Sequence, residues 1–247
     1  MAIVYKSNGL LKESRSAVKE YIIKKKNNNP NYTVLDLGGA ANPWCDELVD
    51  VYVDCYDMNL PTKRQIIGDI LDVDTWKKIK EVAPDFVICT HTLEDLRDPI
   101  FVLNNINNLQ VSAGYISMPN KYTELSNIES MLFVGYSHHR WIFSLNEDVL
   151  NIVAKWGMAN IFSYYSKWNY FFQRLPILGK IIANKNDTLN WLPKPILPWY
   201  NKKLGNGRNE LGFIFEEKIE FIQIDNDYAL STRRLYEVYI KELAKGL

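Results

Sequence analysis

The chain of 247 residues carries 29 basic and 29 acidic side chains, so its formal net charge is zero. This length suits one large domain that buries its own hydrophobic core. A domain whose main function is to bind a nucleic-acid backbone usually has more basic than acidic side chains. The balanced charge therefore argues against a nucleic-acid partner.

The three cysteines form no C-x-x-C pair, which argues against a disulfide framework and a structural zinc. The N-terminal residues lack the apolar run of a signal peptide. No stretch of about 20 apolar residues predicts a transmembrane helix. We therefore expect a cytoplasmic protein without a transmembrane segment.

Short apolar runs that end in Gly or Asp alternate with amphipathic segments over the first 120 residues. This alternation predicts parallel strands joined by helical crossovers, with helices on both faces of a doubly wound α/β sheet. Asp74 and Asp98 are the expected N-caps of two of the helices. Strands are expected over 33–39, 50–54, 64–69, 85–90 and 114–119, and helices over 12–26, 74–82 and 97–109.

The second half of the chain is less regular. Ser144 and Glu147 have the spacing of a capping box, which predicts a helix over 147–156. Residues 156–200 hold 11 of the 32 aromatic residues, which indicates an insertion. We expect a single domain over 1–247, with its core at 30–155 and 209–247 and an aromatic insertion or lid at about 156–208. A late antiparallel pair is expected over 210–216 and 218–224, followed by an amphipathic helix over 231–244.

Acidic residues follow the first three expected strands. Because open parallel sheets bind ligands at the carboxyl ends of their strands, these acids are candidate ligand contacts. Asp36 precedes Gly38 and Gly39, which let the backbone approach a ligand closely. Asp54 can bind both hydroxyls of a ribose, and Asp69 can accept a hydrogen bond from an exocyclic amine such as that of adenine. Together they indicate a cofactor that contains a nucleoside.

The glycine turn distinguishes two such cofactors. A dinucleotide motif would need glycines where Ala40 and Pro43 stand, and the proline spoils the helix start that would bind a pyrophosphate. Asp36 instead suits a ligand with an amino group and no phosphate, namely S-adenosylmethionine. An oxidoreductase that binds NAD is the alternative.

The segments just described carry a resemblance to class I S-adenosylmethionine-dependent methyltransferases. It covers about residues 33–120 and is carried by VLDLGGAANPW, YVDCYD, IIGDI, DFVICTHTLEDLRDP and GYISMPN. It is closest to a branch associated with O-methylation of sugars and glycans, in which a "HRW" segment follows the fifth strand; here this segment is 137–141. Ala40 replaces a usual glycine, and Asp95 stands where this branch commonly has histidine. The resemblance implies a Rossmann-like methyltransferase fold with a mostly parallel seven-stranded sheet and a late antiparallel hairpin.

The resemblance also implies contacts to S-adenosylmethionine, and to the product S-adenosylhomocysteine, at the ends of four strands. These are Asp36, Gly38, Gly39 and Ala40 at the methionine part, Asp54 at the ribose, Cys55, Tyr56, Asp69 and Ile70 at the adenine, and Thr90 and His91 near the methyl group.

A hydroxyl acceptor must lose a proton during methyl transfer, and histidine or a carboxylate can take it. The chain has three histidines, His91, His138 and His139, all expected at the same edge of the sheet. His139, next to Arg140, fits the segment of the related branch better than His138 does. The candidate catalytic residues are therefore His91 and His139. Glu124 and Glu94 are the carboxylate alternatives, and Glu94 is better suited to orienting a backbone or the cofactor. No ligand set in the sequence demands a metal ion, and none is predicted.

These features predict a methyltransferase that acts on a sugar hydroxyl of a glycan or glycan precursor. Another small-molecule or lipid-linked acceptor is the alternative, and a non-catalytic scaffold that binds S-adenosylmethionine is an alternative of another class. The aromatic insertion is expected to cover the acceptor, or else to contact a membrane surface or a protein partner.

Overall fold

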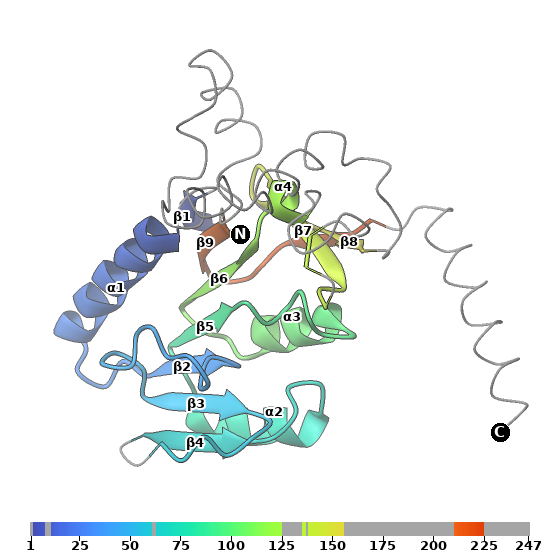
Figure 1. Ribbon diagram of the computed structural model, residues 1–247. Coiled ribbons are helices and arrows are strands. Elements are labelled where there is room, and N and C mark those ends of the chain that lie inside the picture. Colours follow the sequence, from blue (N-terminus) through green and yellow to red (C-terminus); the bar gives the residue numbers. More distant parts are fainter. Residues whose placement is uncertain are drawn as a thin grey trace, which may run out of the picture.

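A computed structural model describes residues 2–7, 11–60, 63–124, 135–136, 138–155 and 210–224 (Figure 1). The aromatic insertion expected at about 156–208 and the helix expected over 231–244 lie outside these residues. Of the described helices, none is both long and apolar enough to cross a membrane.

Seven strands form the central sheet, in the order β1-β9-β6-β5-β2-β3-β4. Strands β2 to β6 run parallel to one another, β9 is antiparallel to β6, and β1 is antiparallel to β9. This arrangement confirms the predicted Rossmann-like α/β fold with a mostly parallel seven-stranded sheet. The strands are β1 (Ala2–Ser7), β2 (Val34–Leu37), β3 (Val51–Asp54), β4 (Arg64–Ile67), β5 (Phe86–Thr90), β6 (Ala113–Pro119) and β9 (Glu210–Glu216).

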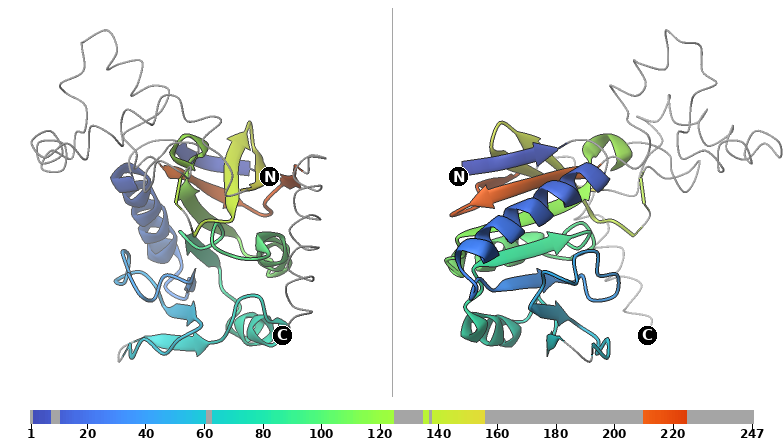
Figure 2. Two further views of the ribbon diagram at one scale, coloured as in Figure 1. Left: turned by 45° about the vertical axis from the view of Figure 1, so that its right-hand side comes forward. Right: turned by 90° about the vertical axis from the view of Figure 1, so that its left-hand side faces the viewer.

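Helices cover both faces of this sheet (Figure 2). On one face, Val18 and Ile22 of α1 (Leu11–Asn28) pack in one apolar cluster with Tyr52 and Ile88 of the sheet. On the other face lie α2 (Val73–Val82) and α3 (Pro99–Asn108). Every residue of β2, β3, β5 and β6 is buried, as expected for parallel strands covered on both sides.

The helix starts follow the expected capping chemistry at α3 but not at α2. Asp98 caps α3, because its carboxylate accepts a hydrogen bond from the Phe101 N–H at 2.9 Å. At α2 the cap is Asp72, which has extended backbone angles and accepts from the Asp74 N–H. The prediction of Asp74 as the cap is therefore wrong, because this residue already lies in the first turn of the helix.

The predicted helix over 147–156 is also wrong. Strands β7 (Trp141–Asn146) and β8 (Val149–Ala154) form an antiparallel hairpin there. Glu147 occupies the turn with φ +53°. Leu150 and Ile152 alternate along β8 and are buried in the same apolar cluster as α2 and α3. The buried side chains recur every two residues, which is the period of a strand, so this segment forms a strand and not a helix. The capping-box spacing of Ser144 and Glu147 is coincidental.

The two late strands exist, but they do not pair with each other as predicted. β9 inserts between β6 and β1 in the central sheet. β10 (Phe221–Gln223) runs parallel to β8 and completes a separate three-stranded sheet of order β10-β8-β7. Glu217, with φ +67°, lies between them, where the chain leaves the central sheet.

Strand β1 was not predicted from the sequence. It lies at the edge of the central sheet, and its side chains alternate between exposed and half-buried. Its partner β9 lies at the far end of the described chain, so no local pattern indicates the pairing. Residues ahead of position 30 thus supply both a strand of the sheet and the helix that covers one face.

Candidate active site

The candidate site lies where the sheet order reverses. The chain proceeds from β2 outward to β3 and β4, and then returns to β5 and β6 on the other side of β2. The connections that leave β2 and β5 at their carboxyl ends therefore diverge, and this is the edge at which open parallel sheets bind ligands. All of the residues expected to bind the cofactor lie at the ends of β2, β3, β4 and β5 or directly after them.

Two glycines shape the turn after β2. Gly38 has φ +81°, and a Cβ atom added there would lie 2.8 Å from Thr92 Oγ1. A Cβ atom on Gly39 would overlap the Asp36 carboxylate. Both positions therefore require glycine, one for its backbone conformation and one for the close approach of a carboxylate.

Asp36 is a buried carboxylate with spare hydrogen-bonding capacity. Its exposed fraction is 1%, and Oδ1 has no partner among the described residues. The pKa of Asp36 is raised to about 7, mainly because burial disfavours the charged carboxylate and, to a smaller extent, because Asp54 is nearby. A hydrogen bond from the Gly39 backbone and the charge of Arg15 act in the opposite direction and lower this pKa. A buried acceptor of this kind suits a ligand that carries a protonated amino group.

Asp54 ends β3 beside this carboxylate. It is largely buried, and the Cys55 thiol lies 3.6 Å from its Oδ1 in a weak hydrogen bond. Tyr56 follows with its side chain mostly exposed. This part of the edge therefore offers one buried carboxylate and one exposed aromatic ring.

The end of β4 lies next to β3. The Gly68 N–H donates to the Asp54 carbonyl at 2.9 Å, which holds the two strand ends together. Asp69 accepts a hydrogen bond from Leu71 N–H at 2.8 Å through Oδ1. Ile70 is buried, and its carbonyl accepts from the Trp76 indole at 2.7 Å. These contacts place Asp69 and Ile70 on a rigid loop.

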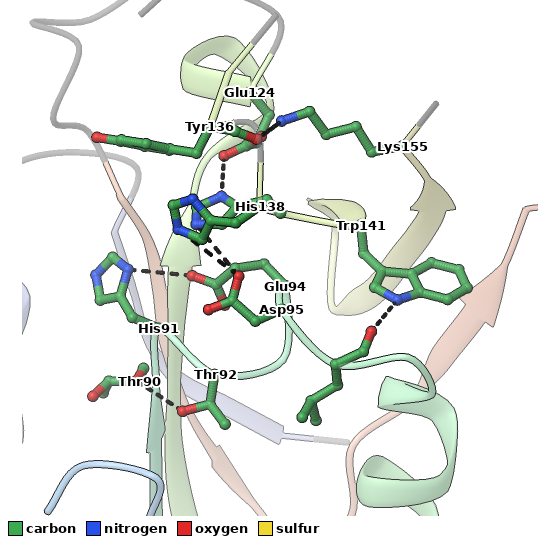
Figure 3. Close-up of polar contacts among 12 residues, drawn as sticks. Thr90, His91, Thr92, Glu94, Asp95, Glu124, Tyr136, His138, Trp141 and Lys155 are labelled. Carbon is green, nitrogen blue, oxygen red and sulfur yellow. Dashed lines mark hydrogen bonds and ion pairs between the residues drawn. The ribbon is translucent and has the colours of Figure 1, made fainter. Parts of the chain in front are cut away.

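His91 follows Thr90 at the end of β5 and lies between two buried carboxylates. His91 Nε2 lies 2.5 Å from Glu210 Oε1. On the other side of the ring, Nδ1 lies 3.2 Å from Glu94 Oε1, a contact drawn in Figure 3. Burial lowers the pKa of His91, but the two carboxylates outweigh it and raise the pKa to about 10. The ring is therefore protonated at neutral pH, which argues against His91 as a general base.

A second buried chain of polar groups ends at His139. His139 Nδ1 lies 2.6 Å from Glu124 Oε1, and Lys155 Nζ donates to Glu124 Oε2 at 2.6 Å. Glu124 ends α4 (Lys121–Glu124), and its side chain is 1% exposed. Gly135 lies against it, since a Cβ atom there would overlap Glu124 Oε2. Both carboxylate oxygens are occupied, so Glu124 holds the imidazole in place, and among the described residues Nε2 of His139 makes no hydrogen bond.

His139 Nε2 faces the loop after β5. Asp95 Oδ1 lies 3.8 Å from His139 Nε2 and 4.0 Å from His138 Nε2. One ligand atom of each of these three residues lies within 4.8 Å of the others. The structure thus brings His138 and His139 together with Asp95, while His91 belongs to a separate cluster with Glu94 and Glu210.

Several residues of this edge were not found by sequence reasoning. Glu210 begins β9 and Arg15 belongs to α1, and nothing in either segment indicates that it would reach the ends of the parallel strands. Lys155 was assigned to a helix that does not form. Of these residues, only Thr92, next to His91, lies in a segment that the sequence analysis had assigned to the cofactor edge of the sheet.

No protein-family model matches this sequence, and a search of the curated proteins finds no match either. Solved structures do resemble it. A SAM dependent methyltransferase from Archaeoglobus fulgidus is 14% identical with a TM-score of 0.35, over 80% of this chain and 94% of that one. The plantazolicin methyltransferase BamL, solved in complex with a triazolic desmethylPZN analog and SAH, is 11% identical with a TM-score of 0.38, over 82% of this chain and 84% of that one. An ADP-L-glycero-D-manno-heptose-6-epimerase from Helicobacter pylori is 12% identical with a TM-score of 0.29, over 44% and 45%. These similarities do not assign a function to this chain.

Proposed function

We propose that the chain is an S-adenosylmethionine-dependent methyltransferase that acts on a sugar hydroxyl of a glycan or glycan precursor. The observation that carries the proposal is the row of acids Asp36, Asp54 and Asp69 at the carboxyl ends of three neighbouring parallel strands, beside a turn that requires glycine. S-adenosylmethionine supplies an activated methyl group when bound.

The residues present fit this cofactor. The unpartnered Oδ1 of Asp36 can accept from the amino group. Gly38 and Gly39 allow the turn to pack tightly against Thr92 and the Asp36 carboxylate, so that its backbone can border the methionine part. Asp54 can accept from both ribose hydroxyls, because it ends the strand next to that turn. Cys55, Tyr56, Asp69 and Ile70 are the proposed neighbours of the adenine, and Thr90 borders the methyl end.

Buried acceptors support a hydroxyl-rich substrate. Glu94 Oε2 and Glu210 Oε2 are buried without a partner among the described residues. Glu94 lies in the loop after β5, and Glu210 begins β9. Buried polar atoms normally have a hydrogen-bond partner, so these suit the several hydroxyls of a sugar. We propose that His139 acts on the acceptor hydroxyl through its Nε2, and that His91 orients Glu94 and Glu210.

Calorimetric titration with S-adenosylhomocysteine tests the cofactor. We expect saturable binding by the wild-type protein and at least about a hundredfold weaker binding by Asp54→Ala. Asp148→Ala is the matched control, because Asp148 is half exposed in the β7–β8 turn and its nearest basic partner is Lys6. No binding at millimolar S-adenosylhomocysteine would overturn the proposal, and binding of NAD in the same titration would favour the oxidoreductase.

A tritiated-methyl assay against nucleotide sugars, oligosaccharides and lipid-linked sugars tests the acceptor. Methylation of a sugar is the expected result. Cofactor binding without transfer to any acceptor in the panel would favour the non-catalytic scaffold, whereas transfer only to acceptors without a sugar would favour another small molecule.

A further inference from the structure

We propose that Asp95, His138 and His139 form a binding site for one divalent transition-metal ion of the zinc type. Two imidazoles and one carboxylate are the donor set of many catalytic zinc sites, in which a further coordination position stays open. Asp95 lies in the loop after β5, and the two histidines lie just ahead of β7, separated from it by Arg140. The site is thus built from segments that only the fold brings together.

The distances fit a site that closes on a metal ion. The separations of 3.8 Å and 4.0 Å between Asp95 Oδ1 and the two Nε2 atoms are too long for direct hydrogen bonds. Zinc bonds of about 2.0 to 2.2 Å in tetrahedral geometry place the ligand atoms about 3.4 Å apart. Small rotations of Asp95 and His138 can supply the difference, because their side chains are 44% and 60% exposed.

A second, independent observation is the support behind His139. In metal sites a ligating histidine commonly donates its other ring N–H to a carboxylate, which fixes the tautomer. Glu124 holds His139 Nδ1 in this way, and Lys155 holds Glu124 from the other side (Figure 3). With Nδ1 bonded to a carboxylate, Nε2 presents its lone pair toward Asp95. The buried charges of Glu124 and Lys155 thus orient one ligand of the site.

The backbone on both sides of Asp95 is also fixed to the histidine segment. The Arg140 N–H donates to the Glu94 carbonyl at 2.7 Å, and the Trp141 indole donates to the Leu96 carbonyl at 2.7 Å. These two hydrogen bonds hold the loop and the start of β7 against each other. Asp95, between Glu94 and Leu96, therefore lies opposite the imidazoles as a consequence of the backbone.

The site also gives a chemical role to His139. A metal ion held there would occupy Nε2, so His139 would act as a ligand and not as the proton acceptor. The ion would leave a coordination position for the acceptor hydroxyl and lower its pKa, so that the proton would pass more readily to water. This role rests on the proposed function, whereas the metal site itself does not.

The test is binding of Co²⁺ to the full chain after dialysis against a chelator. We expect one equivalent to bind and to produce the visible absorption of Co²⁺ in a nitrogen and oxygen site, and Zn²⁺ to displace it. His138→Ala and Asp95→Asn should each weaken binding at least about a hundredfold, and Glu124→Gln should weaken it about 10- to 100-fold. Asp148→Asn is the matched control and should bind as the wild type does.

Circular dichroism of each variant establishes that it is folded, which is expected for the exposed Asp95 and His138. Absence of the absorption band, or binding that is equal in wild type and His138→Ala, would overturn the metal site. S-adenosylhomocysteine binding, measured on the same samples, reports on the proposed function separately. We expect the His138→Ala variant to keep that binding.

Discussion

His91 Nε2 lies 2.5 Å from Glu210 Oε1, which joins the end of β5 to the start of β9 across the intervening β6. The imidazolium neutralises part of the charge of two buried carboxylates, Glu210 and Glu94. This contact links a residue that the sequence marked as a catalytic candidate to a strand about which the sequence indicated no function.

The first prediction concerns this contact. Because the folded-state pKa of His91 is raised to about 10, the stability that it contributes is fully present below about pH 6.5 and is lost as the pH rises toward 10. The side chain is 39% exposed, so solvent screening reduces the contribution to about 1 to 2 kcal/mol. Urea unfolding at pH 6.5 and at pH 10 should show this loss in the wild type and a smaller one in Glu210→Gln. Equal losses in the two proteins would contradict the prediction.

The second prediction is that Asp36→Asn stabilises the ligand-free protein at pH 8. The folded-state pKa of Asp36 lies near 7, well above its ordinary value, so the folded protein holds a proton that the unfolded chain releases between about pH 4 and 7. The wild type therefore loses stability as the pH rises through this window. The substitution should raise the free energy of unfolding at pH 8 by about 2 to 4 kcal/mol, and by much less at pH 4. Chemical denaturation at the two pH values measures the difference.

The third prediction is that cofactor affinity depends on the ionisation of Asp36. A protonated amino group prefers the carboxylate form, so S-adenosylhomocysteine should bind up to about tenfold more weakly for each pH unit below 7. Isothermal titration from pH 5 to 8 checks the slope. In Asp36→Asn the affinity should be low and nearly independent of pH; a slope that persists in this variant would assign the effect to another group.

The fourth prediction concerns the glycine turn. A Cβ atom on Gly39 would overlap the Asp36 carboxylate, so Gly39→Ala should displace that carboxylate. We expect at least about tenfold weaker binding of S-adenosylhomocysteine and a loss of about 1 to 3 kcal/mol in stability. Ala41→Ser, at an exposed position of the same turn, is the control and should change neither quantity. Normal binding by Gly39→Ala would show that Asp36 does not contact the cofactor.

The fifth prediction separates a hairpin from a helix at residues 141–154. Ser144 lies in β7 opposite Asn151, so Ser144→Ala removes no helix cap and should change the free energy of unfolding by less than about 0.5 kcal/mol. Asp98→Ala removes the cap of α3 and should cost about 1 kcal/mol. Thermal unfolding of both variants compares them directly, and a similar loss in both would argue for a helix at 147–156.

The sequence by itself determined the parallel half of the fold and the cofactor edge. Buried strands between helices read as short apolar runs, and the turn after β2 carries two glycines, of which Gly39 lies against Asp36 only three residues earlier. These are local constraints, each written within a few consecutive residues. The ends of β2, β3, β4 and β5 could therefore be assigned without coordinates.

Only the tertiary structure decided the remaining features, because they depend on contacts between distant residues. β1 and β9 pair across nearly the whole described chain, and β8 forms a strand because Leu150 and Ile152 find an apolar cluster to pack in. The three histidines also show which properties the sequence indicates and which depend on the tertiary structure. The sequence placed all three at one edge of the sheet, but Glu210 and Glu94 raise the pKa of His91, while Glu124 and Lys155 orient His139 toward Asp95. Their charge states and orientations follow from partners that the fold supplies.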